Sequence, residues 1–339
     1  MPRMELSQAD VQQIQTLLAE LAERYDTAEC QEFQKNATVL SHRLPESVRT
    51  FLTQFRLTEP DDGCCIISGY PFDQGKIGPT PAHWKNRADK PSTREEDMLF
   101  VLLGSLLGDC IGWSTQQSGY IVHDIMPIKG NEGEQLGTGS EELLWWHTED
   151  AFHPYRGDYI GMMCIRNPDH VPTTIGTLED VDLDPNDVDL LFEESYSIKP
   201  DESHLKKNRS GLRQGDRALE DAFNRMEERN TNPPKMAVLF GSKTNPYLRL
   251  DPYFMDKATT EEAQGAFDRL VEKLDDAIRE VPLQDGDFCF VDNLKAIHGR
   301  LPFKARYDGT DRWLKRIIIA RDLRKSRDER METESRLIL

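Results

Sequence analysis

Apolar residues recur at helical spacing in two segments of this chain, residues 7–26 and 259–279. Ser7 is placed to cap the first segment, and Thr259 or Thr260 the second, because hydroxyl oxygens accept hydrogen bonds from free first-turn amides. Both segments predict amphipathic helices whose apolar stripes face a hydrophobic core. The stripes consist of Val11, Ile14, Leu17, Leu18, Leu21 and Tyr25, and of Phe267, Leu270, Val271, Leu274 and Ile278.

Elsewhere the apolar residues form short runs rich in β-branched and aromatic side chains, separated by turns such as Gln284-Asp285-Gly286. Runs of this kind are typical of strands in an antiparallel sandwich or barrel. The pattern predicts a mainly β protein with added helices, an α+β fold. The runs cover residues 64–70, 158–165, 236–241, 247–251, 287–293 and 313–320.

Residues 196–235 interrupt this pattern with many charges and weak periodicity. A stretch of this length inside a compact domain is typical of an active-site lid or of disorder, and we predict a lid. The chain has 339 residues, of which 37% are hydrophobic, so it can bury a substantial core. We interpret residues 1–339 as one domain with N-terminal helical decoration.

The net charge of the chain argues against some classes of binding partner. The chain has 42 lysine and arginine residues against 60 aspartate and glutamate residues, a net charge of −18. This charge repels nucleic acid and anionic lipid surfaces, so we expect neither as a partner. The N-terminal residues lack an apolar signal-peptide region, and no stretch approaches the roughly 20 apolar residues of a membrane span. We expect a soluble cytoplasmic protein that acts on a small molecule, and its oligomeric state stays open.

The six cysteines are scattered without regular spacing, so they are expected to be small buried hydrophobic residues. Cys64 and Cys65 are neighbours in a predicted strand. Strand alternation points them to opposite faces, which argues against a shared metal ion.

The first candidate for chemistry is the run Trp146-His147-Thr148-Glu149-Asp150. In an extended segment His147 and Glu149 lie on the same face, where they can bind one cation together. On its own the His-x-Glu spacing is a weak signal, because chance produces it often in an acidic chain.

His298 supplies the context, since it comes just after the strand predicted at 287–293. Two histidines and one carboxylate on a β scaffold form the facial triad that leaves three positions open on iron(II). Two of these positions can take the keto acid of 2-oxoglutarate and the third can take dioxygen, so that oxidative decarboxylation generates an oxidant beside the substrate. His147, Glu149 and His298 therefore predict a non-haem iron centre.

A 2-oxoglutarate site also needs a cation for the distal carboxylate, and arginine offers a planar, two-pronged contact. Arg312 opens the last predicted strand, and alternation places Arg312, Leu314 and Arg316 on one face. The alternative is a solvated basic surface over residues 300–327. In an acidic protein we favour the carboxylate-binding wall.

Several separate segments occur together, and in the same order, in one known family: residues 80–84, 106–119, 145–169, 198–205, 247–251, 291–303 and 306–327. In these segments the chain resembles the clavaminate synthase-like iron and 2-oxoglutarate dependent oxygenases, and within them the arginine β-hydroxylases of the viomycin and streptolidine pathways. The resemblance implies a double-stranded β-helix (jelly-roll) core flanked by helices. It also implies Fe(II), 2-oxoglutarate and O2 as cofactor and co-substrates. The expected reaction is hydroxylation of a free amino acid, L-arginine or a close guanidino relative, at the β (C3) carbon in natural-product biosynthesis.

The resemblance further implies roles for individual residues. His147, Glu149 and His298 would bind iron, and Arg312 would hold the 2-oxoglutarate carboxylate. Gln116, together with the non-ligating oxygen of Glu149, would hold the α-amino group of the substrate.

The rest of the substrate site is implied in the same way. Arg316 would bind the α-carboxylate, Asp251 would be the first of two aspartates around a guanidinium, and Asp201 would belong to the lid. The second aspartate is replaced by Tyr253. This departure leaves the substrate open, because a tyrosine that donates and accepts hydrogen bonds also suits citrulline, lysine or a cyclic arginine derivative such as enduracididine or capreomycidine.

Two other functional classes share part of the pattern. A zinc hydrolase or deaminase also uses His-x-Glu, but its Pro-Cys-x-x-Cys signature is absent. A non-catalytic jelly-roll binding module would need neither an open iron site nor Arg312.

Among the other histidines, His153 is expected to be structural and His204 could contact substrate under a closed lid. No acidic residue or histidine lies at ligand spacing from His42, His83, His123 or His170.

Overall fold

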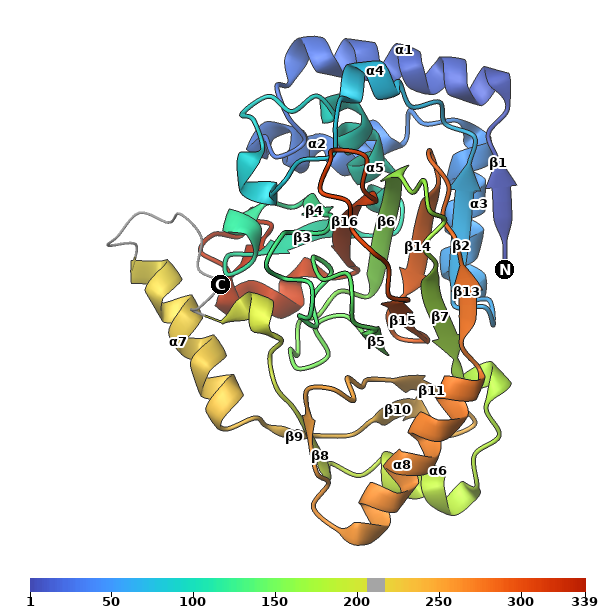
Figure 1. Cartoon of the computed structure of the whole chain (residues 1–339), viewed down its shortest axis with the longest axis vertical. Helices are drawn as coiled ribbons and strands as arrows, with labels where there is room; N and C mark the ends of the chain where they lie inside the picture. The colour runs from blue at the N-terminus through green and yellow to red at the C-terminus, as the bar shows by residue number, and fades with distance from the viewer. Residues whose placement is uncertain (206–216) are drawn as a thin grey trace.

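The structure of the chain, a computed structural model, describes residues 1–205 and 217–339. Two β-sheets lie at its centre (Figure 1). The larger sheet has the order β1 (Arg3–Glu5), β2 (Cys64–Ser68), β14 (Phe288–Asp292), β6 (Tyr159–Arg166), β16 (Trp313–Ala320), β3 (Asp109–Trp113) and β17 (Leu337–Ile338), with β4 (His123–Ile125) also paired to β16. The smaller sheet has the order β13 (Arg279–Val281), β7 (Thr173–Thr177), β15 (Ala296–Arg300) and β5 (Leu144–His147).

The two sheets pack face to face. One cluster of buried apolar side chains joins them, with Ile66, Ile160 and Ile318 from the larger sheet and Ile175 and Ala296 from the smaller. Neighbouring strands are antiparallel, except that β1 pairs with β2, and β17 with β3, in parallel. The predicted β sandwich with added helices is confirmed, and its core is the jelly roll that the resemblance implied.

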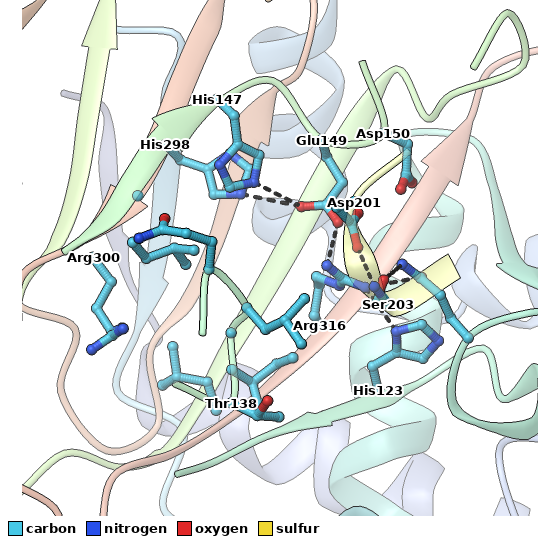
Figure 2. A pocket seen from close by; sticks show the side chains of 18 of the residues that line it. His123, Thr138, His147, Glu149, Asp150, Asp201, Ser203, His298, Arg300 and Arg316 are labelled. Carbon is cyan, nitrogen blue, oxygen red and sulfur yellow. Dashed lines mark hydrogen bonds and ion pairs between the residues drawn. The ribbon is translucent and has the colours of Figure 1, made fainter. Parts of the chain in front are cut away.

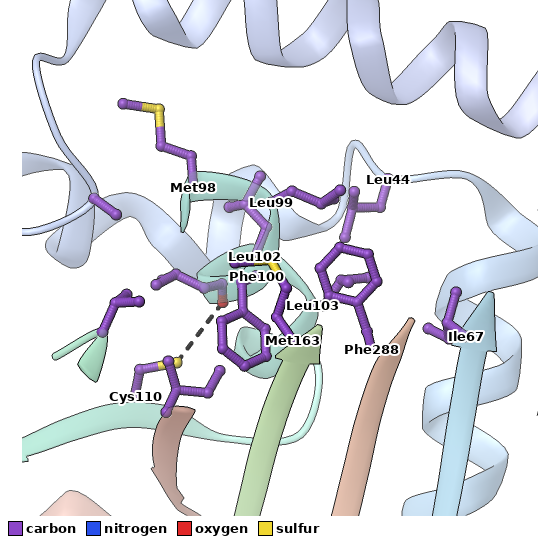
Figure 3. Close-up of a cluster of buried hydrophobic side chains, with 14 of the residues drawn as sticks. Leu44, Ile67, Met98, Leu99, Phe100, Leu102, Leu103, Cys110, Met163 and Phe288 are labelled. Carbon is purple, nitrogen blue, oxygen red and sulfur yellow. Dashed lines mark hydrogen bonds between the residues drawn. The ribbon is translucent and has the colours of Figure 1, made fainter. Parts of the chain in front are cut away.

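Helices cover the other face of the larger sheet. They are α1 (Gln8–Arg24), α2 (Gln31–Ser41), α3 (Glu46–Thr58) and α5 (Arg94–Ser105), and α4 (Gln74–Ile77) follows β2. Figure 3 shows the resulting core, in which Phe100 and Leu103 of α5 meet Phe288 and Met163 of the sheet. None of the described helices is both long and apolar enough to cross a membrane.

The smaller sheet is covered on its outer face as well. Trp146 and Ile297 point away from the site into a cluster with Leu270 and Leu274. That cluster is built by α6 (Pro185–Leu191), α8 (Glu261–Asp276) and the hairpin of β10 (Leu239–Ser242) and β11 (Asn245–Leu248). The remaining elements are α7 (Arg217–Thr231), β8 (Tyr196–Ile198), β9 (Lys235–Met236), β12 (Met255–Asp256) and the short 3-10 helices η1 (Trp84–Asn86), η2 (Gln117–Gly119), η3 (Leu178–Asp180), η4 (Glu202–His204) and η6 (Leu323–Glu329).

Both predicted helices are confirmed, with ends set by their caps. Ser7 accepts from the Asp10 amide while the Asp10 carboxylate accepts from the Ser7 amide, which closes a capping box at the start of α1. Thr260, not Thr259, caps α8 by accepting from the Ala263 amide at 3.1 Å.

Four of the six predicted strands correspond to β2, β6, β14 and β16. The other two predictions are only partly right. The run 236–241 is divided between β9 and β10, and the run 247–251 contributes only its first two residues to β11. His298 follows the predicted strand 287–293, which is β14, but it lies inside β15, a strand of the opposite sheet that was not predicted.

The structure places Cys64 and Cys65 as expected. Cys65 packs against the helices and Cys64 against the smaller sheet, so their side chains point to opposite faces of β2. Burial raises the pKa of the Cys64 thiol to about 12. Such a thiol stays protonated and is a poor metal ligand.

The predicted lid segment contains more regular structure than its weak periodicity indicated. It includes β8, η4, α7 and β9, and α7 buries Leu219, Ala222, Phe223 and Met226 at helical spacing. Residues 206–216 of this segment lie outside the described residues. Its function as a lid stays a prediction.

A buried ion cluster fixes β16 to the helical layer. Lys315 Nζ lies 3.0 Å from both Asp97 Oδ1 and Asp124 Oδ1, and its side chain is 1% exposed. We expect Lys315→Met to lower the free energy of unfolding by about 3–5 kcal/mol, because it leaves buried Asp124 without its cation and leaves buried Asp97 with only Arg87, 3.4 Å away. Denaturant unfolding followed by circular dichroism measures this. The control is Lys243→Met, which removes an exposed pair with Asp189 and is expected to cost less than about 1 kcal/mol.

Candidate active site

The predicted iron ligands come from the smaller sheet and the turn that follows it. His147 is the last residue of β5, and His298 lies directly opposite it in the antiparallel pairing with β15. Glu149 follows the end of β5, where Asn293 Oδ1 accepts from its amide at 2.7 Å and Asn293 Nδ2 donates to its carbonyl at 3.0 Å. Strand pairing and this amide contact together fix the three side chains relative to one another.

The three side chains converge on one point (Figure 2). Glu149 Oε2 lies 3.3 Å from His298 Nε2 and 3.9 Å from His147 Nε2. His147 Nδ1 lies 2.8 Å from the Trp145 carbonyl, so Nδ1 carries the proton and Nε2 presents its lone pair to the site. Two imidazole nitrogens and one carboxylate oxygen are the donors that non-haem iron(II) takes while keeping positions open. The residues therefore fit iron(II).

The electrostatics of the triad favour a cation. Burial alone would raise the pKa of Glu149, but Arg316 and the two histidines hold it well below its usual value. Burial likewise opposes a charge on His147, yet Glu149 and Asp251 raise its pKa to about 9. The negative charge that draws a proton to His147 is the charge that a divalent metal ion would neutralise.

Two buried arginines form a cationic wall in the same pocket. Arg312 is 6% exposed, its Nη2 donates to Thr173 Oγ1 at 3.3 Å, and its Nε has no partner among the described residues. Arg300 donates only to backbone carbonyls, among them that of Ser140 at 3.0 Å. Burial lowers the pKa of each to about 10, and the two cations oppose each other at Arg300.

Neither arginine has a carboxylate partner within residues 1–205 and 217–339. A buried guanidinium without a counter-ion is costly, so this wall fits a bound anion. The distal carboxylate of 2-oxoglutarate has the charge and the two-pronged geometry that Arg312 suits.

Opposite the triad, the larger sheet contributes Arg316. Its Nη1 donates to Glu149 Oε1, and its Nη2 donates to Gln116 Oε1 at 3.2 Å and to His123 Nδ1 at 2.9 Å. A cation and the carboxylate of a predicted iron ligand are thus paired with each other in the pocket (Figure 2).

The pocket also carries acidic groups from a different part of the chain. Burial raises the pKa of Asp251 to about 6, which the His147 charge partly offsets, and Asp201 is close enough to add to the rise. Tyr253 lines the same pocket and is 54% exposed. The structure therefore brings together every site residue predicted from the sequence, although their individual roles stay predictions. Lining the one pocket are Gln116, His147, Glu149, Asp201, Asp251, Tyr253, His298, Arg312 and Arg316.

Sequence reasoning missed several polar residues of the pocket, among them His123, Thr173 and Arg300, whereas Ser203 lies in the predicted lid segment. Arg300 follows His298 by two positions on β15, so alternation would have identified it had that strand been recognised. No local signal marks His123 or Thr173, because they reach the site only through their pairing with β16 and β15.

His153 and His204, two of the histidines considered in the sequence, lie outside the triad and do not line the pocket. His153 is fully buried, and its Nε2 lies 3.2 Å from Glu329 Oε2, which matches the expected structural role. His204 is also fully buried and contacts Thr115 Oγ1 at 2.9 Å and Asp150 Oδ1 at 3.0 Å. In this structure His204 therefore joins the segment after β8 to the protein core rather than pointing into the pocket.

Comparison with known proteins agrees with this site. Residues 193–318 match the family model described as taurine catabolism dioxygenase TauD, TfdA family. The chain is 43% identical over 341 residues, 99% of each protein, to enduracididine beta-hydroxylase of Streptomyces hygroscopicus. It is also 43% identical over the full length of both chains to L-ornithine/L-arginine 3-hydroxylase of Catenulispora acidiphila.

Among solved structures, the non-heme iron oxygenase OrfP in complex with Fe, succinate and (3S)-hydroxy-L-Arg is similar along the whole length of both chains, with 45% identity and a TM-score of 0.95. Clavaminate synthase 2 of Streptomyces clavuligerus is 28% identical over 86% of this chain and 84% of its own length. The chain therefore belongs to the clavaminate synthase-like oxygenases of the TauD family, which depend on non-haem iron(II) and 2-oxoglutarate.

Proposed function

We propose that this oxygenase hydroxylates a free α-amino acid with a cationic side chain, L-arginine or a close guanidino relative, at the C3 carbon. The observation that carries the proposal is the ion pair of Arg316 with Glu149 beside Gln116. An α-amino acid has one anion and one cation on the same carbon. Its carboxylate can pair with Arg316, and its ammonium can pair with Gln116 and with Oε1 of Glu149, the oxygen that is not assigned to the metal and that now accepts from Arg316.

The other end of the substrate is proposed to lie against Asp251. A carboxyl group whose pKa burial raises to about 6 is stabilised in its charged form by a cationic partner. Asp201 adds a second negative charge to this wall. Two relatives of similar length are named as hydroxylases of arginine, ornithine or enduracididine at the 3 or β position, which agrees with a cationic side chain and with C3.

In this proposal the chain's own residues bind and orient the reactants. Iron with 2-oxoglutarate and O2 supplies the oxidising chemistry, in which one oxygen atom enters the substrate C–H bond and the other enters succinate as CO2 leaves. His147, Glu149 and His298 would hold the metal, and Arg312 with Thr173 would hold the distal carboxylate. Because Glu149 would serve both metal and substrate, it would fix the substrate head group close to the metal, which favours reaction near the α-carbon.

The segment Asp201–His204 is proposed to cover the substrate. Asp201 and Ser203 line the pocket, and Ser203 Oγ accepts from Gln116 Nε2 at 2.6 Å. This contact joins the predicted lid to a residue proposed to hold the α-amino group.

The cytoplasmic location, the absence of a nucleic acid partner and the single-domain organisation stay predictions from the sequence.

The substrate is tested with a panel of arginine, ornithine, lysine, homoarginine, citrulline, enduracididine and capreomycidine. Succinate release and a mass gain of one oxygen atom score each compound, and NMR of the product locates the hydroxyl group. Hydroxylation of arginine or a cyclic guanidine at C3 supports the proposal. Succinate release with none of these amino acids, at a site that binds iron and 2-oxoglutarate, would contradict it.

Changing Asp251 separates charged from neutral substrates. If the side chain of the natural substrate ends in a guanidinium, Asp251→Asn should lower kcat/KM for arginine by several hundredfold or more. The reason is that the buried cation of the substrate loses its counter-ion. For a neutral ureido group the loss should be about 1–2 kcal/mol, close to tenfold. Exposed Asp256, which pairs with Lys199, provides the control Asp256→Asn, and its expected effect is negligible.

Tyr253 provides the complementary change. Tyr253→Asp should raise the preference for arginine over citrulline, because a second carboxylate penalises a group that cannot neutralise it. Relative kcat/KM for the two compounds measures the effect. Faster turnover of citrulline than arginine by the unmodified protein, reversed in Tyr253→Asp, would show that the natural substrate has a neutral end group.

A further inference from the structure

His123 is a pocket residue that neither the iron site nor the 2-oxoglutarate wall uses. It lies on β4, directly opposite Arg316 in the antiparallel pairing of β4 with β16. The side chain is 2% exposed, and its Nδ1 lies 2.9 Å from Arg316 Nη2 (Figure 2).

The partner of His123 decides which ring nitrogen carries the proton. A guanidinium has donors only, so Nδ1 must accept the hydrogen bond from Arg316 and the proton lies on Nε2. Burial and the Arg316 charge hold the pKa of His123 well below its ordinary value, which keeps the ring neutral. His123 is therefore a permanent acceptor facing Arg316.

The donors of Arg316 can be counted from its contacts. Both Nη2 hydrogens are used, one by Gln116 Oε1 at 3.2 Å and one by His123 Nδ1 at 2.9 Å. Nη1 donates one hydrogen to Glu149, while Nε has no hydrogen-bond partner among the described residues. Two acceptors on one nitrogen fix the plane of the guanidinium and leave one hydrogen of Nη1 for a ligand.

Contacts of the next residue, Asp124, fix the backbone of β4 beside His123. The Asp124 carboxylate accepts a hydrogen bond from Trp313 Nε1 at 2.9 Å and pairs with buried Lys315, on the face of β16 opposite to Arg316. Gln117 contacts both the amide and the carbonyl of Asp124, at 3.0 Å and 2.9 Å. These contacts hold the backbone next to His123, and of the three side chains Gln117 and Lys315 also line the pocket.

We infer that His123 is a positioning residue for substrate recognition, which holds the Arg316 guanidinium in the plane that receives the α-carboxylate of the amino acid. This inference rests on the proposed function, because it takes Arg316 as the carboxylate-binding residue. It adds that α-carboxylate affinity depends on a neutral hydrogen-bond acceptor behind the arginine. It predicts no direct role for His123 in holding iron or 2-oxoglutarate.

Two variants separate this role from simple packing. His123→Leu removes the acceptor at similar volume, whereas His123→Asn places an amide oxygen close to the position of Nδ1. The ligands are L-arginine and agmatine, which is arginine without its carboxylate. Binding to the full-length, metal-free protein is measured by calorimetry, and KM and kcat are measured separately with the iron-loaded enzyme.

For His123→Leu we expect arginine binding to weaken about 10- to 100-fold, as for loss of one hydrogen bond to a charged group. Agmatine binding should change less than about threefold, and His123→Asn should restore most of the arginine affinity. The effect should fall on KM more than on kcat, with the absorption band of the iron–2-oxoglutarate complex retained. His42→Leu, a change at an exposed histidine, serves as the control.

Unchanged arginine binding in His123→Leu, or equal losses for arginine and agmatine, would overturn the inference. Equal losses in the leucine and asparagine variants would also overturn it, because packing alone would then account for the effect. If the unmodified protein binds and turns over no free amino acid, the proposed function fails and this inference fails with it. If the unmodified protein binds and hydroxylates arginine but His123→Leu does not weaken arginine binding, only the inference on His123 fails.

Discussion

Replacing His298 with alanine should abolish iron binding and hydroxylation while the protein stays folded. The side chain supplies one of three metal donors, and its Nε2 lies 3.3 Å from Glu149 Oε2. A site with two protein ligands in place of three loses metal affinity, and without iron no oxidant forms. Anaerobic titration with iron(II) and 2-oxoglutarate, followed by the visible absorption band of the chelate, measures the loss directly.

The loss should not come from unfolding. His298 is paired through its backbone to β5 and β7, and these contacts do not depend on the imidazole. Circular dichroism and thermal unfolding of the metal-free protein should therefore be close to those of the unmodified chain. His147→Ala should behave in the same way, and exposed His42→Ala should retain full activity. Normal turnover by either triad variant would show that the metal ligands are misassigned.

Replacing Arg312 with alanine should raise the 2-oxoglutarate concentration needed for half-maximal turnover by about 30-fold to several thousandfold. Loss of one partner of a buried, charge-assisted contact costs roughly 2–5 kcal/mol, and each 1.4 kcal/mol corresponds to about a factor of ten. Arg300 is a second buried cation of this wall, but it donates to the backbone carbonyls of Ser140, Leu301 and Glu142, so it is not expected to replace Arg312 fully. Steady-state kinetics with 2-oxoglutarate varied at saturating substrate measures the change.

Three comparisons make the Arg312 result specific. KM for the amino acid should change far less than that for 2-oxoglutarate, because the proposed substrate contacts lie at Arg316 and Asp251. Arg312→Lys should recover part of the affinity, since lysine keeps the charge but lacks the two-pronged geometry. Arg306→Ala removes an exposed arginine paired with Asp169 and should have no effect. Equal changes in both KM values would mean that Arg312 does not bind the co-substrate.

Elements with a clear two-sided pattern were predictable from the sequence. The stripes of α1 and α8 face the core with caps at Ser7 and Thr260, and the last predicted strand matches β16 residue for residue. By contrast, α5 was missed. Its residues from Glu96 to Ser105 are all buried, so no polar face remains to mark the helical period.

In the candidate site, too, residues placed by a local pattern were predictable from the sequence, and residues placed by distant contacts were not. Local alternation was enough to place His147 with Glu149 and Arg312 with Arg316, because each pair lies within a few residues along one extended segment. The donor chemistry of a facial triad joined His298 to the first pair, and the family resemblance then added the substrate residues. The pocket that unites them confirms the grouping.

Sequence alone thus determined the residue types predicted for the iron centre and the co-substrate anchor, since the donor chemistry of histidine, carboxylate and arginine limits what they bind, and strand alternation paired His147 with Glu149 and Arg312 with Arg316. Only the tertiary structure decided which distant groups complete the site. Strand register puts His298 opposite His147 and His123 opposite Arg316. Such pairings depend on contacts between residues far apart in the chain, which carry no local periodicity. For this reason the neutral acceptor behind Arg316 and the second buried arginine, Arg300, became visible only in the folded protein.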